Sequence, residues 1–326
     1  MNVPPSFDLI DDVDLSGLKV AVVRAALELD VFGLVEAGVT DDAGLAAALG
    51  ASGRGVTVLV RALCSLGLLE RVEGRLQCSD TAAAYLVPES PTSAVAIYLG
   101  WLRRRDRLVD AISDGCPPTD HAAGEGAREW RAYAAPDLLR WPTRVPDLTA
   151  RLTERGLMPA PGEHLLDLGC GSGIVGFTMA AAVEGVRVTS VDRPAVLDVT
   201  GQLATAMGLA DRVTLEVGDV LSWTIPPNRY DQVLVVNIAQ YIHDEPLVDL
   251  LARARAAIRP GGRLYLATPV IDDGTPGNDT NWASAIEMYL NSNVDQRNEA
   301  AVYELFSRGG WSDVQRLGPN GFLAHS

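Results

Sequence analysis

The sequence predicts an α/β protein, with a doubly wound, mostly parallel sheet in its C-terminal half and a mainly α-helical domain in its N-terminal half. Two observations predict the sheet. Residues 165–168 form a short apolar strand that leads into closely spaced glycines and an apolar helix, and two more apolar strands follow at 186–191 and 213–217. A third observation predicts the helical domain, because apolar residues recur at helical spacing between residues 18 and 68.

The composition fits a folded chain of about two domains. Of its 326 residues, 48% are hydrophobic and 21% are charged, which is enough apolar material for a substantial core. We expect an N-terminal domain over residues 1–115, a helical linker over 116–147 and a C-terminal domain over 148–326. The net charge of −15 opposes nonspecific binding to nucleic acid or to an anionic membrane surface, so neither is expected as a partner.

The sequence also indicates a compartment. The four cysteines show no C-x-x-C pairing, which favours a reducing, intracellular environment. The first residues are acidic rather than basic, unlike a signal peptide. No apolar run approaches the length of a membrane span. A cytoplasmic location is therefore expected.

The N-terminal elements indicate a winged helix. Three helices are expected, over residues 18–37, 43–49 and 53–68. Asp41 or Thr40 can cap the second helix, and Gly67 closes the third. Residues 69–77 are typical of a small hairpin that turns at Glu73-Gly74. A winged helix raises the hypothesis of DNA binding, but these elements lack the clustered basic residues that a DNA reader needs.

The middle of the chain carries a charge run and several aromatic residues. Residues 79–115 are expected to be helical and include the arginine-rich run 103–107. We interpret this run as a solvated face; the alternative is that one arginine binds a substrate carboxylate or a partner subunit. Trp130, Tyr133 and Trp141 recur through the next helical stretch, and such residues usually belong to a core.

Strands and helices alternate to the end of the chain. The remaining expected elements are strands at 232–236 and 260–267, helices at 246–258, 282–290 and 299–308, and final strands from residues 314 and 321. Asn298 is in place to cap the last helix. This alternation is typical of a sheet with helices on both faces.

The glycines at 169, 171 and 173 predict a cofactor cradle. They allow a tight turn in which a ligand lies against the main chain at the start of a helix, where backbone N–H groups point outward. Gly171 also begins a G-x-G-x-x-G pattern that is typical of dinucleotide sites. However, Asp167 lies two residues before the first glycine, and its carboxylate would repel a pyrophosphate. A cationic ligand such as S-adenosylmethionine, a sulfonium that carries an ammonium, suits this site better.

Two later acidic residues support the second cofactor. The strand at 186–191 ends at Asp192, about 20 residues past the glycines, in place to bind ribose hydroxyls. The strand at 213–217 ends in Gly218-Asp219. With Asp167 and the glycine motif, these positions resemble the class I S-adenosylmethionine-dependent methyltransferases, whose Rossmann-like domain begins with acidic-x-Gly-x-Gly-x-Gly. The resemblance implies that Asp219 contacts the adenine amino group. The predicted cofactor-binding residues are Asp167, Gly169, Gly171, Gly173, Asp192, Asp219, Val220 and Asn237.

The N-terminal half resembles the winged-helix dimerisation domain of small-molecule O-methyltransferases, the plant phenolic and bacterial antibiotic-tailoring type. The stretch that carries this resemblance is Ala25-Ala-Leu-Glu-Leu-Asp-Val-Phe-Gly-Leu-Val35. The resemblance implies a homodimer formed through the N-terminal domain and a small-molecule acceptor from secondary metabolism. It also implies that the segment with Trp130, Tyr133 and Trp141 roofs the acceptor pocket.

The catalytic position departs from the resembled family. There, a histidine just after the fourth strand removes the proton of the acceptor. The matching residue is Gln240, followed by Tyr241 and Ile242, and a glutamine cannot accept a proton at neutral pH. His243 and Asp244 lie three and four residues further on. The predicted catalytic residues are therefore Gln240, Tyr241, His243 and Asp244.

Three mechanisms remain open. In the first, His243 is the base for O-methylation. In the second, the acceptor is already an enolate or another activated nucleophile, and Gln240 and Tyr241 orient it. In the third, His243 and Asp244 bind a divalent or ferric metal ion together with Asp295, as the resemblance to the α-keto acid C-methyltransferases of this fold suggests.

A different class of function also remains open. Some proteins of this fold bind S-adenosylmethionine without transferring its methyl group, and use the sulfonium charge for rearrangement, decarboxylation or hydroxylation. Detection of S-adenosylhomocysteine as a product distinguishes the two classes.

Overall fold

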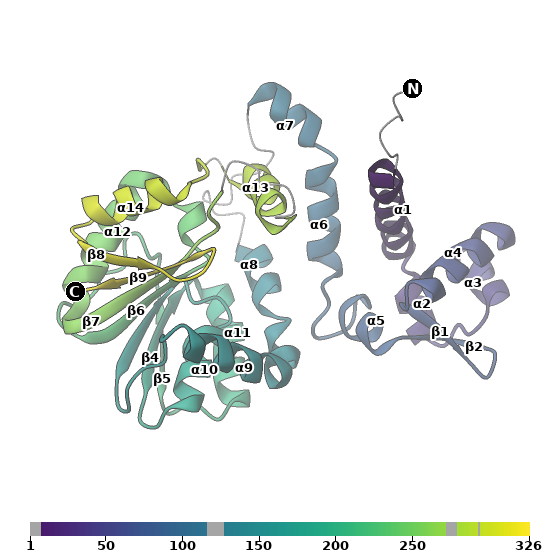
Figure 1. Ribbon diagram of the computed structural model, residues 1–326. Helices are drawn as coiled ribbons and strands as arrows, with labels where there is room; N and C mark the ends of the chain where they lie inside the picture. The colour runs from purple at the N-terminus through teal and green to yellow at the C-terminus, as the bar shows by residue number, and fades with distance from the viewer. Residues whose placement is uncertain (1–7, 116–126, 272–278, 293) are drawn as a thin grey trace. The chain divides into compact units, whose positions relative to one another are not determined.

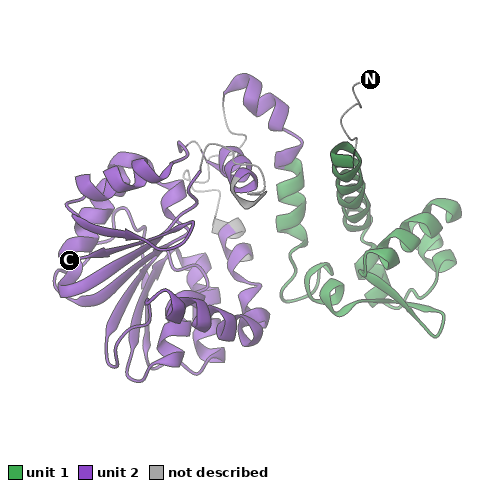
Figure 2. Ribbon diagram, viewed as in Figure 1, with its two compact units in different colours: residues 1–103 green, residues 104–326 purple. Residues whose placement is uncertain are grey.

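The computed structural model describes residues 8–115, 127–271, 279–292 and 294–326. The chain divides into two compact units, residues 1–103 and residues 104–326 (Figures 1 and 2). Residues 116–126 of the predicted linker 116–147 lie outside the described residues. The predicted domain limit at 147/148 lies inside one helix, α9 (Asp137–Glu154), which runs through it unbroken.

The first unit has the helices and the hairpin of a winged helix. Its elements are α1 (Asp8–Glu28), α2 (Val31–Glu36), α3 (Asp42–Leu49), α4 (Gly53–Ser65), β1 (Leu69–Val72), β2 (Arg75–Cys78), α5 (Asp80–Tyr85) and most of α6 (Val95–Arg105). Asp41, and not Thr40, caps α3, because its Oδ1 accepts a hydrogen bond of 2.7 Å from Gly44 N. The hairpin turns at Glu73 and Gly74, both with positive φ, as this tight turn requires.

The prediction of one helix over 18–37 is wrong. The chain forms two helices, separated where Asp30 adopts a left-handed conformation with φ of 53°. The first helix also begins at Asp8, before the predicted start at residue 18. Its early turns carry apolar side chains that remain exposed, with Leu9 exposed by 72% and Val13 by 62%. Because these side chains do not pack into the core of this chain, no pattern of core residues marks the early start of the helix.

The second unit is built on a seven-stranded sheet with the order β5-β4-β3-β6-β7-β9-β8 (Figure 1). Its strands are β3 (His164–Leu168), β4 (Arg187–Asp192), β5 (Val213–Val217), β6 (Tyr230–Val236), β7 (Ile258–Ala267), β8 (Asp313–Arg316) and β9 (Gly321–His325). The first five strands in this order are parallel, and β9 pairs antiparallel with both β7 and β8. This arrangement confirms the predicted doubly wound, mostly parallel sheet.

Helices cover both faces of this sheet (Figure 1). The helices of the second unit, besides α9, are α7 (Leu108–Asp114), α8 (Ala127–Ala134), α10 (Ile174–Ala182), α11 (Pro194–Ala206), the short 3-10 helix η2 (Ala239–Tyr241), α12 (Asp244–Ala257), α13 (Asp279–Asn291) and α14 (Glu299–Arg308). Successive residues of β6 face opposite cores, as the two-residue period of a strand requires. Val233 and Val235 pack with α12 and α14, whereas Leu234 packs with α9 and α10.

The prediction that the chain has no membrane span can be compared with the helices of the structure. No single helix in the described part of the chain combines the length and the apolar composition that a membrane span needs. The pair α3 and α4 reaches these limits only when the two are counted together, across a bend of 119°.

Candidate functional site

The glycine bend after β3 has one open position between two closed ones. All three of its glycines have positive φ. A Cβ added at Gly169 would lie 2.2 Å from Ile238 Cδ1, and one at Gly173 would lie 2.6 Å from the Phe177 ring. A Cβ at Gly171 would meet no protein atom within 4 Å. The outer glycines are therefore required by packing, and the middle one leaves its backbone accessible to a ligand.

Asp167 is a buried carboxylate that favours a positive charge beside it. Its exposed fraction is 2%. Burial, and secondly the nearby carboxylate of Asp192, raise the pKa of Asp167 to about 7. Neither of these two causes stabilises the ionised form. A cationic ligand at this edge of the sheet would do so, and would itself be bound more tightly by the ionised carboxylate.

Asp192 fixes the glycine bend from the neighbouring strand. Its Oδ2 accepts a hydrogen bond of 2.9 Å from Gly171 N, and its Oδ1 accepts one of 2.7 Å from Arg193 N. Burial raises the pKa of Asp192, although these two backbone N–H groups lower it. A carboxylate has further lone pairs, so Asp192 can hold the bend and still accept hydrogen bonds from a ligand.

The structure brings the other predicted cofactor residues to the same edge of the sheet. The strands β5, β4, β3 and β6 are adjacent, and their carboxyl ends present Asp219, Asp192, Asp167 and Asn237 in that order. Asp219 Oδ1 accepts from Leu221 N at 2.9 Å, and its Oδ2 lies 4.0 Å from Arg193 Nη2. Val220 is buried in the core beneath this edge. Such an edge is the usual ligand site of a doubly wound sheet.

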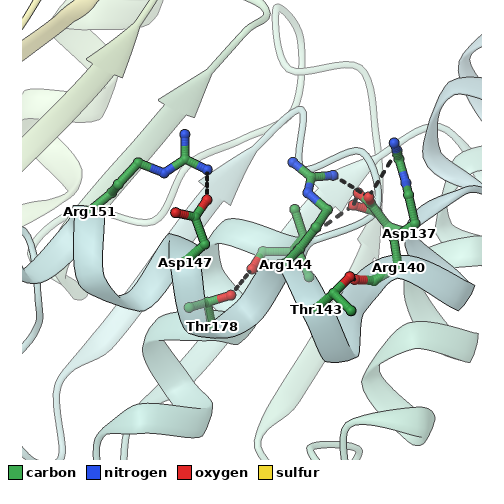
Figure 3. Close-up of polar contacts among 9 residues, drawn as sticks. Asp137, Arg140, Thr143, Arg144, Asp147, Arg151 and Thr178 are labelled. Carbon is green, nitrogen blue, oxygen red and sulfur yellow. Dashed lines mark hydrogen bonds and ion pairs between the residues drawn. The ribbon is translucent and has the colours of Figure 1, made fainter.

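Asp137 links the glycine bend to α9, a role that its place in the sequence does not indicate. Its buried carboxylate accepts a hydrogen bond of 2.6 Å from Ser172 Oγ, and Ser172 lies between two glycines of the bend. Arg140 and Arg144, on the next turns of α9, converge on the other oxygen of Asp137 (Figure 3). Only their spacing of three and seven residues along one helix face could have indicated the cluster.

Gln240 and Tyr241 lie beyond the end of β6, next to the aromatic residues of α8. Gln240 Nε2 donates to Asn237 O at 3.0 Å, and Asn237 has a positive φ of 55°. The Tyr241 ring packs edge-on against Trp130, with the ring centroids 4.8 Å apart. Burial, and secondly the neighbouring Tyr133, raise the pKa of Tyr241 to about 12, so this phenol stays protonated near neutral pH.

The structure separates His243 and Asp244 into different surroundings. His243 is exposed and is the first residue before α12. Asp244 is bound by Arg297, whose Nε donates to Asp244 Oδ1 at 2.8 Å. Asp295 is exposed. Within the described ranges, no group of three or more His, Cys, Asp or Glu side chains is placed to hold a metal ion.

Arg297 is a buried residue that sequence reasoning missed. Its exposed fraction is 5%. Besides Asp244, its guanidinium donates to the backbone oxygens of Ala239, at 2.8 Å, and Ile242, at 2.5 Å. These contacts hold both ends of the turn that carries Gln240 and Tyr241. Nothing in the sequence near Arg297 indicates them, because its partners lie more than 50 residues earlier in the chain.

The arginine run at 103–107 is only partly a solvated face. Arg104 is buried, with an exposed fraction of 7%, and its charge lowers the pKa of Tyr241 against the stronger effect of burial. Arg105 is exposed, and its Nε donates to Glu287 Oε1 at 2.6 Å. The interpretation of the whole run as a solvated face is therefore wrong for Arg104, because successive residues of a helix point in different directions and cannot all face solvent on one side.

Two known domain families match this chain. Residues 165–262 match the family described as methyltransferase domain. Residues 15–88 match the O-methyltransferase dimerisation domain. The first match contains the glycine bend and all the strand-end residues described above. The second begins within α1 and contains the winged-helix elements from there to α5.

Several curated proteins are similar over most of the chain. The acetylserotonin O-methyltransferase of Mus musculus is 28% identical over 92% of this chain and 82% of its own length. The 3-hydroxy-5-methyl-1-naphthoate 3-O-methyltransferase of Streptomyces sahachiroi is 27% identical over 82% of this chain and 79% of its own. The mitomycin biosynthesis 6-O-methyltransferase of Streptomyces lavendulae is 25% identical over 93% and 88%.

Solved structures share the fold over the full length. Human N-acetylserotonin methyltransferase in complex with S-adenosylmethionine is 21% identical, with a TM-score of 0.73, over 100% of this chain and 99% of that one. The N,N-8-amino-8-demethyl-D-riboflavin dimethyltransferase from Streptomyces davawensis is 19% identical, with a TM-score of 0.75, over 99% of both chains. At these identities the likeness shows the fold.

Proposed function

We propose that this chain, which belongs to the S-adenosylmethionine-dependent methyltransferases that carry an O-methyltransferase dimerisation domain, methylates a hydroxyl oxygen of a small molecule of secondary metabolism. The observation that carries the proposal is the buried Asp167, with its raised pKa, beside the open glycine bend. The three curated relatives named above are O-methyltransferases, which favours an oxygen acceptor here.

We assign the cofactor contacts to the carboxyl ends of four adjacent strands. When bound, S-adenosylmethionine supplies an electrophilic methyl group on a sulfonium. Asp167 balances the positive charge of this ligand, and the Gly171 backbone approaches it closely. Asp192 accepts hydrogen bonds from the ribose hydroxyls, and Asp219 from the adenine amino group. Val220 and Asn237 complete the site from beneath and beside it.

The acceptor end orients its ligand rather than deprotonating it. Trp130 and Tyr241 offer an aromatic edge and face against which a flat acceptor can pack. Of the three mechanisms, the one without a base is favoured, because His243 is exposed and Asp244 already binds Arg297. The same ion pair disfavours the metal-dependent C-methylation of an α-keto acid.

The matched dimerisation domain implies that the chain forms dimers, and we propose that two copies of this chain form a homodimer. The exposed apolar side chains of α1 support it, because a folded chain seldom leaves so many large apolar side chains in water. These side chains are Leu9, Ile10, Val13, Leu15 and Leu18. Light scattering at micromolar concentration is expected to give twice the chain mass, and a Leu9→Glu/Val13→Glu variant is expected to give the single mass.

Two measurements test the function. Calorimetry with S-adenosylhomocysteine is expected to show binding, and a nicotinamide dinucleotide is expected to show none. Incubation with S-adenosylmethionine and a panel of hydroxylated aromatic compounds should release S-adenosylhomocysteine together with a methyl ether. If S-adenosylmethionine is consumed without transfer of its methyl group, a non-methylating enzyme of this fold replaces the proposal.

A further inference from the structure

The amide of Gln240 has a direction that its neighbours determine. Its Nε2 donates to the backbone oxygen of Asn237 at 3.0 Å, and that oxygen can only accept, so the group that faces it must be the amide nitrogen. The other end, Oε1, is buried and has no hydrogen-bond partner in the described structure. A buried carbonyl oxygen without a donor is unfavourable, and a ligand that brings an N–H or O–H group removes the penalty.

Arg297 keeps this oxygen in place. Its guanidinium binds the backbone oxygens of Ala239 and Ile242, on the two sides of Gln240 and Tyr241. It also binds the carboxylate of Asp244 at the start of α12. Arg297 therefore holds the backbone that carries Gln240, and the bond from Nε2 to Asn237 O orients the amide at the end of the side chain.

The groups around Gln240 in the described structure are poor proton acceptors. An amide does not take a proton at neutral pH, and the Tyr241 phenol stays protonated because its pKa is raised to about 12. Asp244 is paired with Arg297, and His243 is exposed at the beginning of α12. Glu287, whose charge also acts on Tyr241, is bound by Arg105. Among the described residues, an acceptor that arrives as a neutral alcohol therefore finds no group well placed to remove its proton.

We propose that the acceptor is a hydroxyl already ionised at neutral pH, with a hydrogen-bond donor on the adjacent atom, and that Gln240 Oε1 binds this donor. The inference rests on the proposed methyl transfer and names its substrate class. In the reaction, a lone pair of the oxygen anion forms the new O–CH₃ bond while the S–CH₃ bond breaks. The bonding pair stays on sulfur, so the anion and the sulfonium give two neutral groups and no proton is released. The acceptor oxygen cannot itself face Oε1, since two oxygens without a proton repel.

Three probes separate the two parts of this proposal. 4-Nitrocatechol has an acidic hydroxyl and an adjacent donor, 4-nitrophenol has a similarly acidic hydroxyl without the donor, and catechol has the donor but a weakly acidic hydroxyl. At pH 7 we expect kcat/KM to be highest for 4-nitrocatechol. We expect 4-nitrophenol to be at least about fivefold poorer, because Oε1 then stays without a donor. Catechol should be poorer by a larger factor that shrinks as the pH rises.

Each contrary result overturns a stated part. Equal turnover of catechol and 4-nitrocatechol at pH 7 means that the enzyme has a base. Equal turnover of the two nitro compounds means that Gln240 Oε1 accepts no hydrogen bond from the acceptor. If none of the three is methylated while S-adenosylhomocysteine binds in the calorimeter, this substrate class is wrong and the cofactor assignment stands. If S-adenosylhomocysteine does not bind, the proposed function itself fails.

Variants of two residues test the same points from the protein side. Gln240→Leu should reduce the preference for 4-nitrocatechol over 4-nitrophenol to within about twofold, with unchanged binding of S-adenosylhomocysteine. Gln240→His should raise the turnover of catechol relative to 4-nitrocatechol, because an imidazole can take the proton. His121 is a histidine outside the described residues, so His121→Ala is the control for a base in that part of the chain. We expect it to leave all three rates unchanged. Loss of catechol turnover in that variant alone would identify His121 as a base and contradict the proposal.

Discussion

The cofactor end and the acceptor end of this site lie along one edge of one sheet, but the chain builds them differently. The cofactor end uses residues at the carboxyl ends of adjacent strands, and short-range contacts hold them: the Asp192 carboxylate accepts from Gly171 N, and two of the glycines pack closely against Ile238 and Phe177. The acceptor end joins α8, the turn after β6 and the segment before α14 through side chains, such as Trp130 against Tyr241. The difference teaches that cofactor recognition is local in this sequence, whereas acceptor recognition depends on distant segments.

The largest expected effect is at the cofactor end. Asp167→Asn should weaken binding of S-adenosylmethionine by about 10- to 100-fold, because a buried charge-assisted contact is worth about 1.5–3 kcal/mol. Calorimetry measures the change. Asp211→Asn is the matched control, since it removes an equal charge from an exposed position of the same unit. Equal affinities in all three proteins would mean that Asp167 does not face the cofactor.

Gly171→Ala tests whether the open position of the bend belongs to the ligand. The new methyl group meets no protein atom, so we expect S-adenosylhomocysteine to bind about tenfold more weakly because the methyl group occupies its place. Gly208→Ala has a similar positive φ and an equally open Cβ after α11. Both variants should lose about 1 kcal/mol of unfolding free energy from the left-handed backbone, but only the first should lose affinity. A similar loss of affinity in both would assign the effect to strain.

Arg297→Met addresses the acceptor end. We expect kcat to fall about tenfold while the affinity for S-adenosylhomocysteine changes by less than about twofold, because the turn with Gln240 and Tyr241 loses its support and the glycine bend does not. Arg297→Lys should recover part of kcat. Arg308→Met is the control, since it breaks an exposed ion pair between the end of α14 and Glu245 of α12. A parallel loss of cofactor affinity would show that the two ends are not separate.

The pH dependence of cofactor binding is a smaller effect with a defined sign. Burial raises the pKa of Asp167 to about 7, and the ionised form binds a cation. Affinity for S-adenosylmethionine should therefore rise by about fivefold between pH 6 and pH 8. The unbound protein should show the opposite trend, because a raised carboxyl pKa favours the protonated folded state and its contribution to stability is lost as the pH rises through 7. Asp167→Asn should flatten both profiles.

The smallest expected effect is that of a chelator. Asp244 is engaged by Arg297, so EDTA should change the methylation rate by less than about twofold. Activity that disappears with EDTA and returns with a divalent or ferric ion would restore the metal-dependent mechanism through His243, Asp244 and Asp295.

The same contrast explains what the sequence could predict. Asp167, Asp192 and Asp219 could be placed because each lies at the carboxyl end of a strand, and parallel pairing brings these ends together. Asp137 and Arg297 could not, because each acts on a partner more than 30 residues away through a side chain. The early start of α1 was missed for another reason: the apolar side chains of its first turns are exposed within this chain, so no buried face marks that part of the helix.

Calorimetric titration of the wild-type protein with S-adenosylhomocysteine and with NAD tests the central claim most directly. A buried carboxylate beside an open glycine bend should accept the adenosyl thioether with its ammonium group and exclude the pyrophosphate. We predict saturable heat with S-adenosylhomocysteine, weakened in Asp167→Asn, and none with NAD. Heat with NAD and none with S-adenosylhomocysteine would contradict the account.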